Sequence, residues 1–189
     1  MMAMDKDLMK KIRAGDSNAF KELFDQTRDY VYNLCFRMTG NHEEAEDSAQ
    51  EVYLKLYRSM RTFRGDSKLS TWIFRITVNT CLSQNRRKKL IRFVTFDFLI
   101  PNEHSNLYSS EKGPDRLLED SETEQIVRQA IEMLPKRQKT ALVLHRYADQ
   151  SCEEIARIME ISLSAVESLI HRAKKNLAVK LTPLKKELK

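Results

Sequence analysis

Apolar residues recur every three or four positions along nearly the whole chain, and the period-two alternation of strands is hardly seen. Between residues 41 and 60, for example, Ala45, Val52 and Leu56 form one helical stripe and polar residues fill the opposite face. The pattern predicts an all-α protein built from two small domains. The expected helices cover residues 17–39, 41–60, 70–89, 122–134, 137–147, 152–159 and 163–181.

Residues suited to helix ends stand at the borders of these segments. Asp16 and Asn41 precede apolar runs as N-caps, and Gly40 follows the first run in the place of a left-handed C-terminal residue. Ser121 and Ser151 are each followed three residues later by Glu, which is the sequence of a capping box.

The charge of the chain changes sign twice along its length. The total of +6 divides into +6 for residues 1–96, −6 for residues 97–124 and +6 for residues 125–189. Two basic modules that meet a polyanion, joined by a segment that the polyanion repels, would show this pattern; a solvated acidic linker would show it too. We assign residues 5–95 to the first domain, 96–121 to an acidic flexible linker and 122–185 to the second domain.

Other features restrict the cellular setting. No run of 18 apolar residues occurs, and acidic residues occupy the start of the chain where a signal peptide needs apolar ones, so neither export nor membrane insertion is expected. Cys35, Cys81 and Cys152 are odd in number and widely spaced, which disfavours a disulfide framework or a zinc site. We therefore expect a cytoplasmic protein.

No set of residues typical of an active site is found. Only four glycines occur among 189 residues, and they form neither a phosphate-binding loop nor a dinucleotide-binding motif. The histidines lack metal-ligand spacing. We predict no enzymatic activity, small-molecule substrate, metal or cofactor. The histidines are His42, His104, His145 and His171.

Residues 151–175 have the pattern of a helix-turn-helix. A short capped helix is followed by a tight link and a longer basic helix, and the small Ala156 fits the point where the two helices cross. A helical hairpin with a solvated basic face is the alternative, but the link length together with the basic second helix favours DNA binding. Candidate base readers are Ser164, Glu167, Ser168 and His171; Ser162 caps the helix beside a phosphate, and Arg172, Lys174 and Lys175 supply positive charge.

A second basic surface is predicted on the helix from about residue 70 to 89. Trp72, Arg75, Asn79, Ser83 and Arg86 are spaced three, four, four and three residues apart, and thus share one stripe. Aromatic, amide and cationic side chains together suit a nucleic acid with exposed bases. The single Trp is alternatively a core residue, and the cationic stripe does not depend on it.

Four ordered motifs resemble those of bacterial RNA polymerase sigma factors of the extracytoplasmic-function (ECF) group. Residues 44–53 are similar to the segment that binds core polymerase, and residues 63–79 to the segment that reads and melts the −10 promoter element. Residues 134–138 and 166–173 are similar to the domain that reads the −35 element. The resemblance extends from about residue 8 to residue 182.

The resemblance implies an alternative sigma factor that binds core RNA polymerase, directs it to promoter DNA and promotes opening, with an anti-sigma factor as a further partner. The acidic linker would pass through the RNA-exit path of the polymerase. Implied core-binding residues are Asp47, Gln50 and Glu51; implied −10 residues are Phe63, Arg64, Ser67, Trp72, Arg75, Asn79 and Arg86; implied −35 residues are Ser162, Ser164, Glu167, Ser168, His171, Arg172 and Lys175.

Three positions depart from the usual pattern of the group. Glu167 stands where a basic residue is common and Leu169 where Arg is common, so the −35 preference of better-known members does not carry over. Glu160 stands at a turn position where Gly is frequent, which costs about 1 kcal/mol if its backbone is left-handed.

A different class of protein also fits part of the pattern. A dimeric helix-turn-helix transcription regulator with an N-terminal sensor or dimerisation domain would bind a palindrome without polymerase. It would have no use for the polar face at residues 47–51 or for Trp72.

Overall fold

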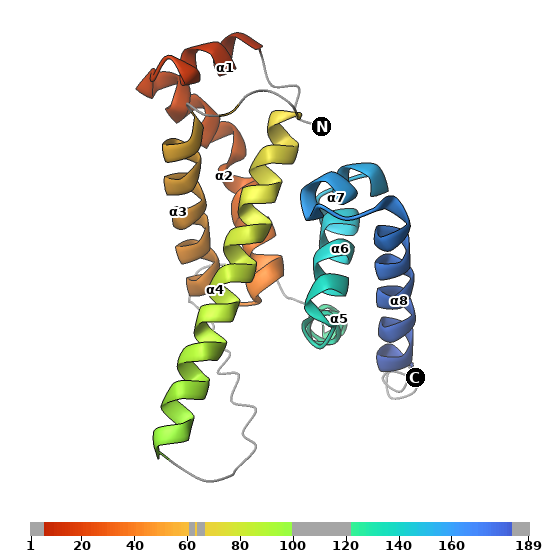
Figure 1. Cartoon of the computed structure of the whole chain (residues 1–189). Helices are drawn as coiled ribbons and strands as arrows, with labels where there is room; N and C mark the ends of the chain where they lie inside the picture. Colours follow the sequence, from red (N-terminus) through yellow and green to blue (C-terminus); the bar gives the residue numbers. More distant parts are fainter. Residues whose placement is uncertain (1–5, 61–62, 64–66, 100–121, 183–189) are drawn as a thin grey trace.

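The computed structural model describes residues 6–60, 63, 67–99 and 122–182, which form helices and no strands, so the all-α prediction is confirmed. The helices make two blocks that lie side by side, α1–α4 and α5–α8 (Figure 1). The helices are α1 Lys6–Arg13, α2 Ser17–Thr39, α3 His42–Ser59, α4 Leu69–Leu99, α5 Glu122–Glu132, α6 Lys136–Tyr147, α7 Cys152–Met159 and α8 Leu163–Leu181.

The predicted caps define the helix ends where the structure describes them. An Asp16 carboxylate oxygen accepts the backbone N–H of Asn18 at 2.8 Å, and Gly40 ends α2 with a left-handed φ of 79°. Asn41 caps α3, and both hydrogen bonds of the Ser151 capping box are present at the start of α7. These contacts satisfy backbone groups that a helix terminus leaves without an internal partner. Ser121 lies outside the described residues.

Two elements differ from the sequence-based expectation. Helix α1 was not predicted, although Leu8 and Ile12 are four residues apart and both buried; an eight-residue helix offers too few turns for its period to stand out. Helix α4 runs to Leu99, so its predicted end near Lys89 was wrong. No glycine or proline interrupts the chain between the start of α4 and Pro101, and residues 96–99, assigned to the linker, are therefore helical. Residues 100–121 lie outside the described part.

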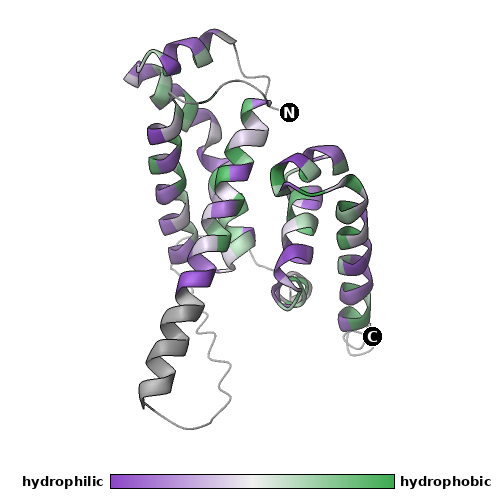
Figure 2. Cartoon of the chain, viewed as in Figure 1, coloured by the Kyte–Doolittle hydropathy of each residue, from purple (hydrophilic) through white to green (hydrophobic). Residues whose placement is uncertain are grey.

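The N-terminal block is held together by apolar contacts among α2, α3 and α4, whose hydrophobic faces turn toward one another (Figure 2). Val31, Leu56 and Val78 are fully or nearly fully buried there. One polar pair is also buried: the Thr27 hydroxyl donates to the Leu23 carbonyl and lies 2.8 Å from the Tyr53 hydroxyl. Burial raises the pKa of Tyr53 to about 12, so this hydroxyl stays protonated and able to donate.

The C-terminal block packs α7 and α8 against α6. Ile155 and Ile158 of α7 and Val166 of α8 are buried, together with Val143 and Leu144 of α6. The outer face of α8 is predominantly hydrophilic (Figure 2). Within the described helices, none combines the length and the apolar character needed to cross a membrane.

Trp72 belongs to the core of the N-terminal block. It is 8% exposed, and its ring centroid lies 4.8 Å from that of Phe63. A buried indole does not present its face to a base, so the observed burial favours the core alternative for this residue over base stacking.

We expect Trp72→Ala to lower the free energy of unfolding by about 3–4 kcal/mol, because it leaves a large cavity between α4 and Phe63. The measurement is urea denaturation followed by far-UV circular dichroism, with Trp72→Phe as the control that keeps an aromatic ring. A loss below about 1 kcal/mol would show that the indole is not a core residue.

Candidate nucleic-acid interface

The helix-turn-helix is formed by α7 and α8 with a three-residue link. Glu160 has a left-handed φ of 54°, as expected for this position, and the Ile161 N–H donates to the Ala156 carbonyl at 3.1 Å. The Ser162 hydroxyl then accepts the Ala165 N–H at 3.3 Å and begins α8. The turn therefore has a defined geometry that orients α8 relative to α7.

Burial of one face of α8 determines which residues point outward. Val166, Ile170 and Ala173 are buried at spacings of four and three, so the residues on the opposite side of the helix face solvent. All seven predicted −35 residues are exposed: Ser162, Ser164, Glu167, Ser168, His171, Arg172 and Lys175.

The Ser162 side chain is already engaged at the start of this face. Its oxygen caps α8 and lies 3.2 Å from the Ser164 hydroxyl. Its contribution to a phosphate site would come through the oriented N–H groups of the first turn. Arg172, Lys174 and Lys175 are exposed further along the helix and give it a basic surface.

The predicted −10 residues of α4 are divided between core and surface. Asn79 and Arg86 are exposed, Arg75 is half-buried, and Trp72 is buried. The Ser83 hydroxyl donates to the Thr80 carbonyl of its own helix at 2.9 Å. The cationic stripe on α4 therefore does not depend on Trp72, which belongs to the core.

The loop before α4 carries the other predicted −10 residues. Phe63 and Ser67 are half-buried, while Arg64 lies outside the described residues. The Phe63 N–H donates to the Met60 carbonyl at 3.2 Å, and the Arg13 guanidinium lies 5.6 Å from the Phe63 ring centroid. Phe63 thus lies between Trp72 and Arg13 of α1. No sequence pattern connected Arg13 with this loop.

The polar face of α3 contains two different kinds of side chain. Asp47 and Gln50 are exposed, whereas Glu51 is half-buried and paired with Lys55 at 2.8 Å. Glu51 also accepts a hydrogen bond from the Gln84 side chain of α4 at 2.8 Å. These hydrogen bonds lower the pKa of the Glu51 carboxyl. Glu51 therefore links α3 to α4 in addition to lying on the predicted polymerase-binding face.

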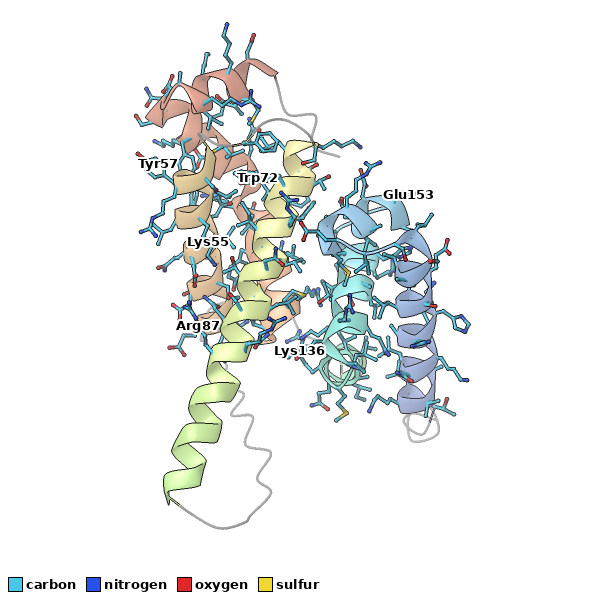
Figure 3. The ribbon with its side chains drawn as sticks, in the orientation of Figure 1. Lys55, Tyr57, Trp72, Arg87, Lys136 and Glu153 are labelled. Atoms are coloured by element: carbon cyan, nitrogen blue, oxygen red, sulfur yellow. The ribbon has the colours of Figure 1, made fainter. Side chains whose placement is uncertain are left out.

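The same face continues into exposed apolar residues. Leu54 and Tyr57 follow Gln50 by four and seven residues and are both exposed, Tyr57 projecting from α3 in Figure 3. Neither residue was among those predicted, although the helical spacing from Asp47 and Gln50 places both on this face. Exposed apolar groups beside a polar patch are typical of a protein-binding surface.

No cluster of ligands for a metal ion was found in the part of the chain that the structure describes. Cys35, Cys81 and Cys152 are free thiols, the first two buried in the N-terminal block. The neighbouring Cys81 thiol, together with burial, raises the pKa of Cys35.

Comparison with known proteins connects both blocks to one family. Residues 23–91 match Sigma-70 region 2, and residues 124–177 match Sigma-70, region 4. The chain is 33% identical to the ECF RNA polymerase sigma factor SigW of Bacillus subtilis over 188 residues, which cover 97% of this chain and 100% of SigW. It is 33% identical to the RNA polymerase sigma-H factor of Pseudomonas aeruginosa, covering 97% of this chain and 96% of that protein.

Two solved structures share the fold. The sigma factor RpoE of Bartonella quintana, in complex with the anti-sigma factor NepR, aligns with a TM-score of 0.66 at 23% identity over 86% of this chain and 96% of RpoE. CnrH in complex with the cytosolic domain of CnrY aligns with a TM-score of 0.67 at 18% identity over 95% of this chain and 97% of CnrH. With both sigma regions matched in order and full-length relatives at 33% identity, the chain belongs to the ECF RNA polymerase sigma factors.

Proposed function

We propose that this alternative sigma factor directs RNA polymerase to promoters through three separate surfaces, on α3, α4 and α8. The observation that carries this proposal is the two-sided character of α8. Its buried residues Val166, Ile170 and Ala173 fix the rotation of the helix, and every predicted −35 residue faces solvent. A capped and basic second helix of this kind fits the major groove of B-DNA.

The −35 element is read by α8 from the major groove. Glu167 accepts hydrogen bonds only, which suits the exocyclic amine of cytosine, and its charge repels nearby phosphates. Arg172 and Lys175 bind phosphates and position the helix without reading sequence. This division makes Glu167 the residue that sets base preference most strongly.

The −10 element is held by α4 and the loop before it. Removing a base from its stack costs a few kcal/mol, which a preformed pocket and a cationic helix together offset. Arg75 and Arg86 hold the backbone of the unpaired strand and Asn79 reads an adjacent base. Trp72 supports the loop from within the core by packing against Phe63.

Core polymerase is bound by the polar face of α3. Asp47 and Gln50 are exposed and available to a partner, and Glu51 presents its carboxylate while Lys55 holds it in place. The acidic linker, of which residues 100–121 lie outside the described part, passes through the basic RNA-exit path of the polymerase. The net charge of −6 over residues 97–124 is attracted there and repelled by DNA.

An anti-sigma factor is the expected inhibitory partner in the cytoplasm, because the structural neighbour RpoE was solved in complex with the anti-sigma factor NepR. The protein itself catalyses no reaction; RNA synthesis belongs to the polymerase.

The function is tested by transcription in vitro. Purified chain is mixed with core RNA polymerase and genomic promoter fragments, and specific run-off transcripts are scored against core polymerase alone. We expect transcripts that depend on the chain. Tight binding to a palindrome without polymerase, and no transcript with it, would instead identify the dimeric regulator.

Asp47→Lys tests the α3 face. We expect it to weaken association with core polymerase at least about tenfold, because it places a repelling charge in a polar interface while the exposed position preserves the fold. Association is measured by titrating labelled core polymerase with the full chain. Asp25→Lys makes the same charge change at an exposed position of α2 and serves as the control. Equal affinities of the two variants would remove Asp47 from the interface.

Glu167→Lys tests the −35 surface. We expect a changed −35 base preference and a steeper loss of binding with salt, since a repulsion becomes a phosphate contact. The readout is selection from a promoter library with randomised −35 bases by the assembled holoenzyme. Glu153→Lys carries the same charge change on α7 and should leave the selected bases as they are. An unchanged preference with Glu167→Lys would show that Glu167 is not a reader.

A further inference from the structure

The C-terminal block is docked on the N-terminal block through α6 against α2 and α7 against α4 (Figure 1). The apolar cores of the two blocks are continuous at this junction. One cluster of buried residues includes Met38 of α2 and Ile73 of α4 together with Val143 and Leu144 of α6. The two blocks are therefore joined by a packed apolar interface.

A buried lysine crosses this interface. Lys139 of α6 is 7% exposed, and its ammonium group donates to the Met38 carbonyl of α2 at 2.9 Å. It also pairs with a Glu132 carboxylate oxygen at 2.6 Å. Met38 lies in the last turn of α2, where carbonyl groups lack partners within the helix and the helix dipole favours a cation. The C-terminal block thus supplies a cationic cap to a helix of the N-terminal block.

Gly40 makes room for this arrangement. A Cβ atom at Gly40 would lie 2.7 Å from Oε1 of Glu132, closer than side chains approach one another. The glycine that ends α2 therefore also admits the carboxylate that accompanies Lys139. Burial raises the pKa of Glu132 despite the nearby ammonium, so its docked position disfavours the charged form. Separation of the blocks would return the Lys139–Glu132 pair to water, and this hydration offsets part of the cost of breaking the hydrogen bond to Met38.

A second set of contacts pairs cations beside the proposed −10 surface with carboxylates of the C-terminal block. Glu160, in the turn of the helix-turn-helix, pairs with Arg75 of α4 at 3.2 Å, and Glu154 of α7 pairs with Lys68 at 2.8 Å. Exposed ion pairs of this kind are weak and readily exchanged for others. Two carboxylates of the C-terminal block thus stand where DNA phosphates would meet Arg75 and Lys68.

We propose that the free chain is autoinhibited by its own helix-turn-helix block, which Lys139 seats on the end of α2 so that Glu160 and Glu154 mask the cations of the −10 surface. This inference rests on the proposed role of Arg75 in −10 binding. Opening exposes Arg75 and frees α7 and α8 to reach a separate DNA element. Because the masking carboxylates and the phosphates compete for the same cations, closure and −10 binding exclude each other.

Two variants of the full chain test this proposal. Lys139→Met removes the cap on α2 and the ammonium group that pairs with Glu132; Arg137→Met removes one positive charge from an exposed position of the same helix and is its control. Glu160→Lys turns the pair with Arg75 into a repulsion at an exposed site, so it preserves the fold even if Lys139→Met does not. Its control is Glu153→Lys, exposed on α7 (Figure 3).

Two readouts are taken without polymerase. The radius of gyration from small-angle X-ray scattering reports closure, and binding of a fluorescent twelve-nucleotide oligothymidine reports access to the cationic surface. We expect wild type and both controls to be compact. We expect Lys139→Met to be extended, and we expect both test variants to bind the oligonucleotide about fivefold or more tightly than their matched controls. For Lys139→Met the gain occurs although the variant has lost a positive charge.

The outcomes separate the proposal from the function on which it rests. An extended wild type would overturn the closed state, and a folded Lys139→Met variant as compact as its control would overturn the role of Lys139 in holding it. Test variants that bind the oligonucleotide no better than their controls would overturn the masking of Arg75. Failure of the sigma function would appear instead as an absence of wild-type run-off transcripts with core polymerase.

Discussion

Each functional helix of this protein has one apolar face that must be buried, and that constraint orients the other face toward a partner. On α8, burial of Val166, Ile170 and Ala173 turns the predicted −35 residues to solvent. On α4, burial of Ile73 and Val78 does the same for Asn79 and Arg86. Hydrophobic burial is the dominant favourable term in folding, so the recognition surfaces are positioned by the core and are not free to rotate.

Electrostatics acts within this frame, and it has two roles that compete. The basic faces of α4 and α8 are suited to DNA, and the same basic character of α4 attracts Glu154 and Glu160 of the C-terminal block. The contacts of the exposed pairs are individually weak. The buried Lys139 is different, because its ammonium group has partners in both blocks and loses one of them when the blocks separate. A protein of this kind holds a closed arrangement that a polyanion can displace.

The proposed polymerase-binding surface on α3 and the proposed promoter-binding surface on α4 are joined by side chains as well as by backbone. Gln84 of α4 donates to Glu51 of α3 and accepts a hydrogen bond from Ser48, while Lys55 bridges Glu51 and the Thr80 hydroxyl. A partner on α3 would therefore contact residues whose hydrogen bonds extend to α4, the helix proposed to face DNA. These bonds hold α3 and α4 in one register and keep the two surfaces at a constant relative position.

Local sequence was sufficient to predict the helical fold class, most helix ends and the outward face of α8, because helical periodicity and capping are local properties of the chain. Asp16, Gly40, Asn41 and Ser151 act as predicted, whereas the length of α4 and the existence of α1 depended on weaker local signals. Tertiary packing was needed to show that Trp72 is buried, that Glu51 is paired with Lys55 and Gln84, and that Lys139 caps α2. Burial and the choice of partner depend on residues far apart in the sequence: Lys139 and Met38 are separated by 101 positions, and no local pattern links them.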